Sequence, residues 1–205
     1  MMKKKIGIFG GTFDPIHNGH IEAAKLLHKK LKLDEILIIP AFLSPLKIKY
    51  KPISAHHRLK MIEIAIKEYE FLKISDYEIK NKKVSYSYNT LRYLNKNFSD
   101  SDLFFLLGSD SLLYLDKWYR VDDIFNLSNV VIYSRPEFDQ VNYLLSKSNL
   151  NIIQKKHIKD NIISIITEKI SSSDIRKKIF LKKDVTNYLL PQVYLYIVEN
   201  NLYES

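Results

Sequence analysis

The stretch Gly10-Gly11-Thr12-Phe13-Asp14-Pro15-Ile16-His17-Asn18-Gly19-His20 joins two different patterns of apolar residues. The short apolar run at residues 6–9 precedes it and is typical of a strand, whereas apolar residues recur at helical spacing after it, at Ile21, Ala24, Leu27 and Leu31. The stretch therefore predicts a strand, a tight glycine turn and a helix that carries two histidines. Such a turn can hold a phosphate, because glycines let the backbone approach an anion and the N–H groups of a helix start point at it.

The residues of this stretch argue against two common classes of phosphate-binding loop. It lacks the Gly-Lys-Ser/Thr ending of a P-loop, and it lacks the Gly-x-Gly-x-x-Gly fingerprint with an acidic residue roughly 20 positions further on. His17 and His20 are three residues apart and share one face of the predicted helix. We interpret them as hydrogen-bond donors to a phosphate whose charge rises in the transition state, with Thr12 adding a hydroxyl. Metal binding and helix capping are the alternatives.

The rest of the chain alternates between strand-like and helix-like patterns. Apolar runs typical of strands cover residues 5–9, 35–40, 72–79, 102–107, 129–134 and 161–167. Helical patterns cover residues 19–31, 55–69, 87–96, 111–118 and 138–146, and two more helices are expected to begin near Ser173 and at Pro191. This alternation predicts an α/β fold, a Rossmann-like parallel sheet with helices on both faces. We expect one domain over residues 1–205, with the C-terminal helices at 173–203 packed on it.

Composition narrows the classes of site and partner. The absence of cysteine excludes disulfides, thiolate metal sites and cysteine nucleophiles, and no apolar run approaches the roughly 18 residues of a membrane span. We therefore expect a cytoplasmic protein that binds no membrane. The net charge of +9 fits anionic ligands such as phosphorylated metabolites or nucleic acid, but it also fits a general lysine-rich bias. Because the lysines are scattered, we expect no nucleic-acid partner.

A second candidate anion site is the segment Ile170-Ser171-Ser172-Ser173-Asp174-Ile175-Arg176, which opens a predicted helix. Ser171 and Asp174 have the spacing of a capping box. Capping does not explain Arg176, because the dipole of a helix favours an acid in its first turn. An arginine beside serines at a helix start forms an anion site, and this role is compatible with capping.

The predicted topology brings these segments together. Ligands of open parallel sheets bind outside the carboxyl ends of the strands. The first glycine turn follows such an end, and so do the segments at 40–47, 108–110 and 134–136. We therefore expect these four segments to meet at one rim of the sheet.

Both anion motifs resemble those of a known superfamily. The first stretch is similar to the H-x-G-H signature of the nucleotidyltransferases, and residues 170–176 are similar to their I-S-S-T-x-I-R motif, with Ser173 in place of the usual threonine. Members join a nucleoside monophosphate from ATP or CTP to a phosphate-bearing acceptor and release pyrophosphate. The resemblance implies that the catalytic residues are His17, His20 and Arg176. It also implies an ATP-binding set, which comprises Gly10, Gly11, Thr12, Phe13, Ser172 and Ser173.

The middle of the chain resembles a narrower family, the bacterial nicotinate-nucleotide adenylyltransferases. The similar segments are residues 39–40 with 44–47, 57–61, 84–87 with 90–91, 104–110, 118–120, 134–136 and the tail from 190 to 203. The chain departs from the family pattern at Ser87, where threonine is usual, at Ser109, where alanine is common, and in the loop at 41–43. The resemblance implies transfer of the adenylyl group of ATP to nicotinate mononucleotide, with Mg²⁺ accompanying ATP and no confident metal ligand from the protein.

The residue types suit such an acceptor. Trp118 could stack on the nicotinate ring, with Tyr119 beside it, or could belong to the core. Ser87 and neighbouring backbone N–H groups could bind the nicotinate carboxylate. The remaining candidates are Lys47 and Arg135 for substrate anions, with a solvated surface charge as the alternative, and Asp110 for ribose hydroxyls or for a helix cap.

Two rival functions stay open at this point. One is a sibling enzyme such as phosphopantetheine adenylyltransferase, which shares both phosphate motifs. The other is a basic, non-catalytic protein that binds nucleotides or nucleic acid. The sequence leaves the oligomeric state open, a homo-oligomer included. His28, His56, His57 and His157 are interpreted as surface or helix residues, and Arg58 as a structural residue within a helix.

Overall fold

β1 (Lys4–Gly11) lies at the centre of a parallel sheet in the computed structural model, which describes residues 3–47, 51–134, 141–165 and 170–204. In this part of the chain the sheet has six strands in the order β3-β2-β1-β4-β5-β6, and every neighbouring pair is parallel. The other strands are β2 (Glu35–Pro40), β3 (Leu72–Ile74), β4 (Ser101–Gly108), β5 (Asn129–Ser134) and β6 (Ile162–Ser164). The order reverses between β1 and β4, which is where a parallel sheet opens a crevice for ligands.

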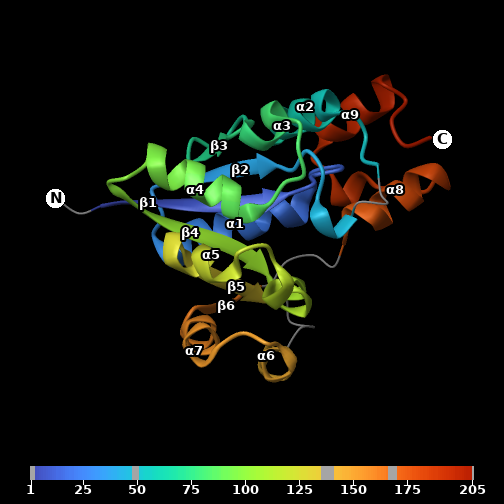
Figure 1. The fold of residues 1–205 in the computed structure, drawn as a ribbon. Helices are drawn as coiled ribbons and strands as arrows, with labels where there is room; N and C mark the ends of the chain where they lie inside the picture. The colour runs from blue at the N-terminus through green and yellow to red at the C-terminus, as the bar shows by residue number, and fades with distance from the viewer. Residues whose placement is uncertain (1–2, 48–50, 135–140, 166–169, 205) are drawn as a thin grey trace.

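Helices cover both faces of the sheet (Figure 1). One face packs against α1 (Asn18–Leu31), α2 (Ala55–Ile66), α8 (Ser172–Phe180) and α9 (Pro191–Glu199). The other packs against α4 (Ser87–Asn97), α5 (Val121–Leu127), α6 (Val141–Lys147) and α7 (Ile152–Asp160). The short helix α3 (Tyr77–Asn81) follows β3, and 3₁₀ turns lie at η1 (Pro45–Lys47), η2 (Ser109–Leu113), η3 (Leu115–Lys117) and η4 (Thr186–Tyr188). The predicted Rossmann-like α/β fold is confirmed.

Alternate residues of each central strand enter opposite apolar layers. In β2, Ile36 and Ile38 belong to the layer of α1 and α2, whereas Leu37 and Ile39 belong to the layer of α4 and α5. Because both faces are covered, the strands are apolar without alternation, which is the pattern seen in the sequence.

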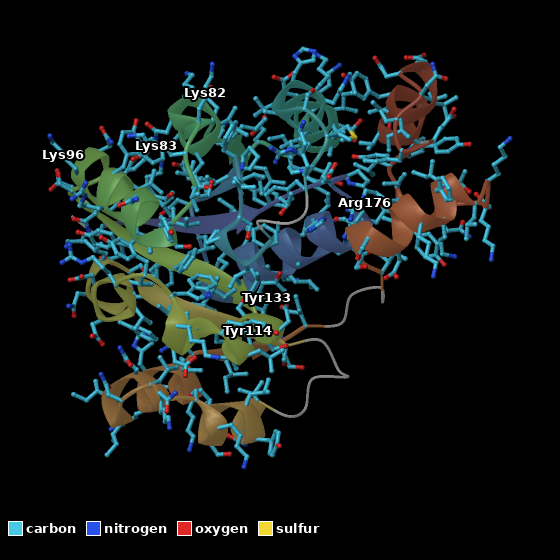
Figure 2. All side chains as sticks on the ribbon, turned by 45° about the vertical axis from the view of Figure 1, so that its right-hand side comes forward. Lys82, Lys83, Lys96, Tyr114, Tyr133 and Arg176 are labelled. Atoms are coloured by element: carbon cyan, nitrogen blue, oxygen red, sulfur yellow. The ribbon has the colours of Figure 1, made fainter. Side chains whose placement is uncertain are left out.

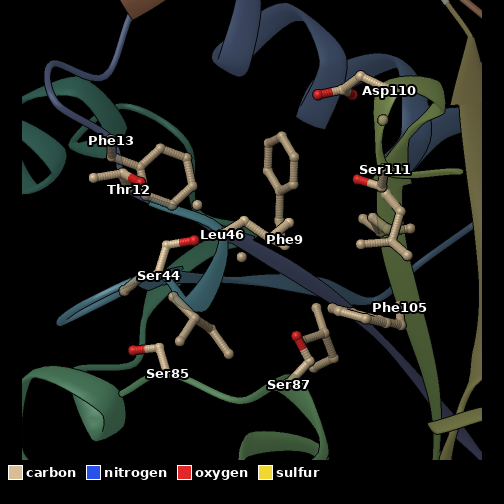
Figure 3. Close-up of a pocket in the computed structure, with 18 of the residues that line it drawn as sticks. Phe9, Thr12, Phe13, Ser44, Leu46, Ser85, Ser87, Phe105, Asp110 and Ser111 are labelled. Atoms are coloured by element: carbon tan, nitrogen blue, oxygen red, sulfur yellow. The ribbon is translucent and has the colours of Figure 1, made fainter. Parts of the chain in front are cut away.

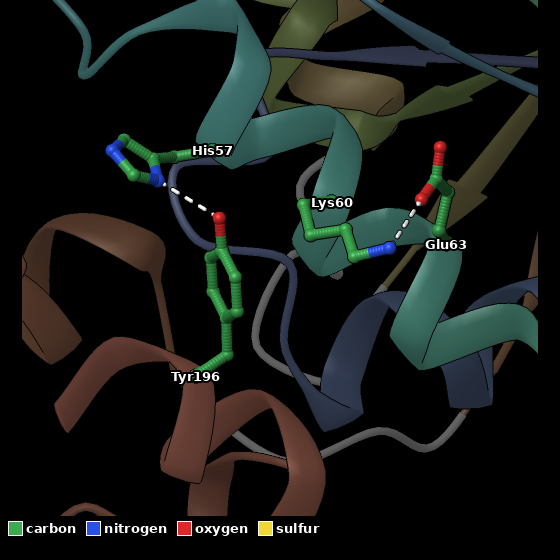
Figure 4. Close-up of polar contacts among 4 residues, drawn as sticks. All are labelled: His57, Lys60, Glu63 and Tyr196. Carbon is green, nitrogen blue, oxygen red and sulfur yellow. Dashed lines mark hydrogen bonds and ion pairs between the residues drawn. The ribbon is translucent and has the colours of Figure 1, made fainter. Parts of the chain in front are cut away.

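The C-terminal helices join the first of these layers. Ile175 of α8 and Val193 and Ile197 of α9 are buried in the same cluster as α1 and α2. His57 Nδ1 and the Tyr196 hydroxyl, from α2 and α9, form a hydrogen bond of 2.9 Å (Figure 4). The predicted start of α9 at a proline is confirmed, as is the helix start close to residue 173.

Three sequence predictions for this scaffold were partly wrong. The strand expected at 72–79 ends at Ile74, because its partner β2 soon reaches Pro40, which has no N–H for the ladder, and residues 77–81 form α3. The helix expected at 111–118 is instead two 3₁₀ turns, since the three-residue spacing of Leu112 and Leu115 suits that conformation too. The helix expected at 55–69 ends at Ile66.

The sequence reading also missed α3, α5 and α7. In α7 the adjacent Ile152 and Ile153 are exposed while Gln154 is buried, so no apolar stripe marks this helix. Two further predictions fall partly outside the described residues, namely the end of the strand at 161–167 and the start of the helix at 138–146. No described helix combines the length and the apolar character needed to cross a membrane.

Candidate active site

A cavity of about 680 Å³ opens at the carboxyl ends of β1 and β4, where the strand order reverses. We call one side of it the histidine wall, formed by residues 10–14, His17, His20, residues 170–173 and Arg176. We call another side the aromatic wall, formed by residues 44–46, Glu78, residues 85–87, Thr90, Trp118 and Tyr119. Figure 3 shows Thr12 and Phe13 across the cavity from Ser87, with Asp110 and Ser111 at the end of β4. The predicted convergence of separate segments at one rim is confirmed for the first motif and for segments 40–47 and 108–110.

The two glycines of the first motif continue the strand and do not form the turn. Gly10 and Gly11 pair with Ile39 and Pro40 in β2, and neither has a positive φ. The left-handed residue is Phe13, with φ of 49°. The predicted glycine turn is therefore wrong, since the chain turns only after β1 has ended at Gly11. The absence of a side chain still matters at Gly10, which lines the cavity and where an added Cβ would meet no atom within 4 Å.

Side chains from distant segments hold the turn after β1 by its backbone carbonyls. Arg176 Nη1 donates to Asp14 O at 2.7 Å, and Ser172 Oγ donates to Pro15 O at 2.9 Å. The Tyr203 hydroxyl donates to the buried carboxylate of Asp14 at 2.7 Å. The start of α8 and the C-terminal segment are thereby attached directly to the first motif. In Figure 2, Arg176 lies on the part of α8 next to α1, on the other side of the molecule from Lys82 and Lys96.

Arg58 supports the same turn, which agrees with its interpretation as a structural residue, although its contacts were not predicted. Its side chain is 1% exposed, and Nη1 donates to Thr12 O and to Ala41 O, both at 2.7 Å. It therefore ties the loop after β1 to the loop after β2. Only its place in an otherwise apolar helix face could have signalled this, because Met61 and Ile62 beside it are also buried.

The histidines occupy the start of α1. His17 is the N-cap residue and is 3% exposed, and its N–H donates to His20 Nδ1 at 3.2 Å. Because Nδ1 of His20 accepts, a neutral His20 ring carries its proton on Nε2. The two rings lie 3.7 Å apart and both line the cavity. Capping by one nitrogen of His20 is thus compatible with hydrogen-bond donation by the other.

The start of α8 is a capping box, as the sequence predicted. Asp174 N–H donates to Ser171 Oγ at 3.1 Å, and Ser171 N–H donates to Asp174 Oδ2 at 3.2 Å. Hydrogen bonds from the side chain and backbone of Ser171 lower the pKa of Asp174. Ser172, Ser173 and Arg176 line the cavity next to the first motif.

The polar groups of the histidine wall suit an anion better than a bare cation. Apart from the Asp14 carboxyl, which accepts a hydrogen bond from the Tyr203 hydroxyl, the side-chain groups are imidazole, hydroxyl and guanidinium groups that can donate hydrogen bonds. Among the residues that the structure describes, no three His, Asp or Glu side chains come together as a metal site. A divalent ion that enters with a polyphosphate would therefore find most of its ligands on that polyphosphate.

Trp118 and Tyr119 lie where the aromatic wall meets the core. Trp118 packs against Phe105, with ring centres 6.1 Å apart, and also lines the cavity. One part of its ring therefore belongs to the core, and another part is available to a ligand. Its Nε1 is buried without a hydrogen-bond partner among the described residues. Tyr119 is 53% exposed and contacts Tyr86, with ring centres 5.1 Å apart.

Of the four remaining candidate site residues, two line the cavity and two lie wholly or partly outside the described residues. Ser87 is the first residue of α4 and lines the cavity. Asp110 also lines it, but Gly108 takes the N-cap position of η2, so the capping interpretation of Asp110 is wrong. The side chain of Lys47 and the whole of Arg135 lie outside the described residues.

The sequence reading missed Glu78, which contributes the only carboxyl of the aromatic wall as defined above. Thr90 Oγ1 donates to Glu78 Oε1 at 2.5 Å, and the Ser85 hydroxyl donates to the same carboxyl. Burial raises the pKa of Glu78, and these two hydrogen bonds oppose the rise. Glu78 was not considered for the site, because residues 72–79 were interpreted as one strand, whereas residues 77–81 form α3.

Comparisons with known proteins agree with this geometry. The family model described as cytidylyltransferase-like matches residues 8–178. Two probable nicotinate-nucleotide adenylyltransferases are each 40% identical to the chain. The one from Clostridium botulinum strain Hall aligns over 96% of this chain and 98% of its own length, and the one from Clostridium perfringens strain SM101 over 98% of both.

Solved structures show the same fold. Nicotinic acid mononucleotide adenylyltransferase of Plasmodium falciparum complexed with NaAD has a TM-score of 0.79 at 23% identity, over 98% of both chains. The same enzyme complexed with APC has a TM-score of 0.75 at 22% identity, again over 98% of both chains. The motifs, the fold and the near-complete alignments agree, and the chain belongs to the cytidylyltransferase-like family of nucleotidyltransferases and, within it, to the nicotinate-nucleotide adenylyltransferases.

Proposed function

We propose that the protein transfers the adenylyl group of ATP to nicotinate mononucleotide and releases deamido-NAD and pyrophosphate. One observation carries this proposal. The segment at 170–176 contacts the first motif directly, and both face a cavity that Ser87 and Trp118 also line. The cavity therefore offers an anion-binding side and a side suited to an aromatic acid within one enclosure.

The reaction needs no covalent nucleophile and no strong general base. The acceptor is a phosphate monoester with a second pKa near 6, so it is mostly dianionic at neutral pH. One of its oxygens attacks the α-phosphorus of ATP, a new P–O bond forms, and the bond to the bridging oxygen breaks as pyrophosphate leaves. The task of the protein is to align two polyanions and to stabilise the charge that develops.

We assign that task to the histidine wall. His17, His20 and Arg176 are proposed as the catalytic donors, and the Nε2 proton of neutral His20 fits this role. The ATP phosphates would meet a further set of groups on the same wall, contributed by Gly10, Gly11, Thr12, Phe13, Ser172 and Ser173. Mg²⁺, bound with ATP, would supply further charge neutralisation.

We assign the acceptor to the aromatic wall and its neighbours. Trp118 and Tyr119 offer ring surface, and Ser87 stands at the start of α4, where the first backbone N–H groups of a helix have no acceptor within it. Asp110 is proposed for ribose hydroxyls. Lys47 and Arg135 remain proposed contacts to substrate anions.

We also propose that residues 1–205 form one nucleotidyltransferase domain on which the C-terminal helices at 173–203 are packed. Ile175, Val193 and Ile197 share an apolar cluster with the helices next to β1, which supports this organisation.

An acceptor panel tests the function. The purified protein is incubated with Mg²⁺-ATP and one of nicotinate mononucleotide, nicotinamide mononucleotide or phosphopantetheine, and pyrophosphate release and the adenylylated product are measured. We expect the highest kcat/KM with nicotinate mononucleotide. Turnover of phosphopantetheine without turnover of nicotinate mononucleotide would overturn the proposal in favour of the sibling enzyme.

A further inference from the structure

The proposed mechanism leaves Glu78 without a role, although this carboxyl lines the cavity. Glu78 lies on α3 and is only partly exposed. A site for two anionic nucleotides gains nothing from an additional carboxylate that merely faces them, because like charges repel. The contacts of Glu78 point instead to a role in building the wall.

Glu78 collects hydroxyl groups from two neighbouring segments. Thr90, which is buried on α4, donates to it at 2.5 Å, and Ser85 donates from the loop that precedes α4. Ser85 Oγ in turn accepts the N–H of Phe42 at 2.9 Å. One carboxyl thus joins α3, the start of α4 and the loop that follows β2.

A second set of contacts closes the same junction. Ser85 N–H donates to Leu43 O at 2.9 Å, and Leu43 and Val84 form a parallel bridge. The backbone and the side chain of Ser85 therefore both hold the loop after β2. This fixes the position of residues 85–87, which line the cavity and lead into α4 at Ser87.

The direction of the hydrogen bonds determines what this wall presents to a ligand. A hydroxyl has one proton, and Ser85 and Thr90 both give theirs to Glu78. Neither hydroxyl therefore offers a proton to the cavity. Ser87 and the backbone N–H groups at the start of α4 remain as donors at this place, and the Glu78 network sets where they lie.

We propose that Glu78 is a positioning residue for the acceptor site. This inference rests on the proposed function and deepens it. Through Ser85 and Thr90, Glu78 holds the start of α4 so that Ser87 and the neighbouring N–H groups meet the carboxylate of the acceptor's aromatic ring. Its network reaches the histidine wall only indirectly, through the loop after β2 that Arg58 ties to Thr12, so its loss acts mainly on the acceptor and much less on ATP.

The test compares Glu78→Ala, Glu78→Gln and Thr90→Val with the matched control Glu63→Gln, an exposed glutamate paired with Lys60 on α2 and outside the cavity (Figure 4). The KM for nicotinate mononucleotide, the KM for ATP and kcat are measured for each variant. We expect Glu78→Ala to raise the KM for the acceptor about tenfold, because hydrogen bonds to the charged carboxylate of the acceptor are lost. The KM for ATP should change less than about twofold. Glu78→Gln and Thr90→Val should lie in between, since each keeps part of the network.

A second readout concerns selectivity. The ratio of kcat/KM for nicotinate mononucleotide over nicotinamide mononucleotide should fall in Glu78→Ala, because misplaced donors no longer favour a carboxylate over an amide. Equal increases in both KM values, or none, would overturn the positioning role. If Glu78→Ala does not fold, Thr90→Val and Glu78→Gln decide by the same criteria. A wild-type protein that does not turn over nicotinate mononucleotide would instead refute the proposed function itself.

Discussion

The two walls of the cavity are built by different means. The turn of the histidine wall is held by three backbone carbonyls, those of Thr12, Asp14 and Pro15, which accept hydrogen bonds from side chains elsewhere in the chain. The aromatic wall depends more on side chains that bind one another, through the carboxyl of Glu78 and the contacts of Tyr119, although the backbone of Ser85 also contacts that of Leu43. A backbone-held wall tolerates little change in shape, whereas a wall held by side chains can be adjusted by single substitutions. We expect the first to carry the chemistry and the second to carry the choice of acceptor.

The largest effect is predicted for the loss of a hydrogen-bond donor from the histidine wall, His20. His20→Ala removes the ring that we propose as a donor to phosphate through Nε2, and the loss of one such donor lowers kcat by about a hundredfold or more. Initial rates with saturating substrates measure this, and circular dichroism checks that the fold survives. The control is His28→Ala on the same helix, where the ring stacks on Phe71 away from the cavity. Near-normal turnover of His20→Ala would remove this residue from the mechanism.

The next prediction concerns a substitution that reduces the space beside the histidine wall without removing any of its hydrogen bonds. Gly10→Ala adds a Cβ that meets no protein atom within 4 Å, so the melting temperature should hold or rise slightly. The added methyl group projects into the space assigned to ATP, and displacement of the phosphates should lower kcat/KM for ATP about tenfold. The acceptor KM should change little. An unchanged kcat/KM for ATP would show that the phosphates do not approach this strand end.

A smaller effect tests whether the C-terminal segment supports the histidine wall. Tyr203→Phe deletes one hydrogen bond to the buried Asp14, which costs about 1 kcal/mol of unfolding free energy, or about 2–4 °C in melting temperature. We expect a rise of a few-fold in the KM for ATP as well. Tyr196→Phe is the matched control, because it deletes a hydroxyl that binds His57 outside the cavity and should affect stability alone. Equal kinetics for the two variants would argue that Tyr203 is only structural.

The same contrast explains what the sequence could predict. The residues of the histidine wall come mostly from two contiguous motifs, so its position at a strand end and at the start of α8 was recognisable, and the capping box of Ser171 and Asp174 was predicted correctly. The conformation of the turn after β1 was predicted wrongly. A motif with two glycines suggests a glycine turn, whereas Phe13 is the residue in the left-handed conformation.

The aromatic wall was less predictable because its contacts join separate segments. Trp118 and Ser87 were chosen by residue type and do line the cavity. Glu78 was not recognised, because its partner Thr90 lies 12 residues away in the chain. Arg58 was interpreted correctly as a structural residue, but its partner Thr12 in the histidine wall, 46 residues away, was not predicted. The sheet order was within reach because apolar runs mark strands, whereas α7 escaped notice because two of its isoleucines face solvent.

The smallest predicted effect concerns the stability of the aromatic wall and its dependence on pH. Burial raises the pKa of Glu78 above its ordinary value of 4.5, so folding favours the neutral carboxyl. The stability that the neutral form contributes is fully present below about pH 4.5 and is lost as the pH rises through the raised pKa. Glutamine cannot ionise, so the melting temperature of Glu78→Gln relative to the wild type should increase between pH 4.5 and pH 8. Glu63→Gln, which removes one charge from an exposed ion pair, is the control for the substitution itself. A difference between Glu78→Gln and the wild type that stays constant with pH would mean that the hydrogen bonds cancel the effect of burial on the pKa of Glu78. A difference that shrinks with pH would mean that hydrogen bonds from Ser85 and Thr90 outweigh burial, and that the carboxylate is stabilised in the wall.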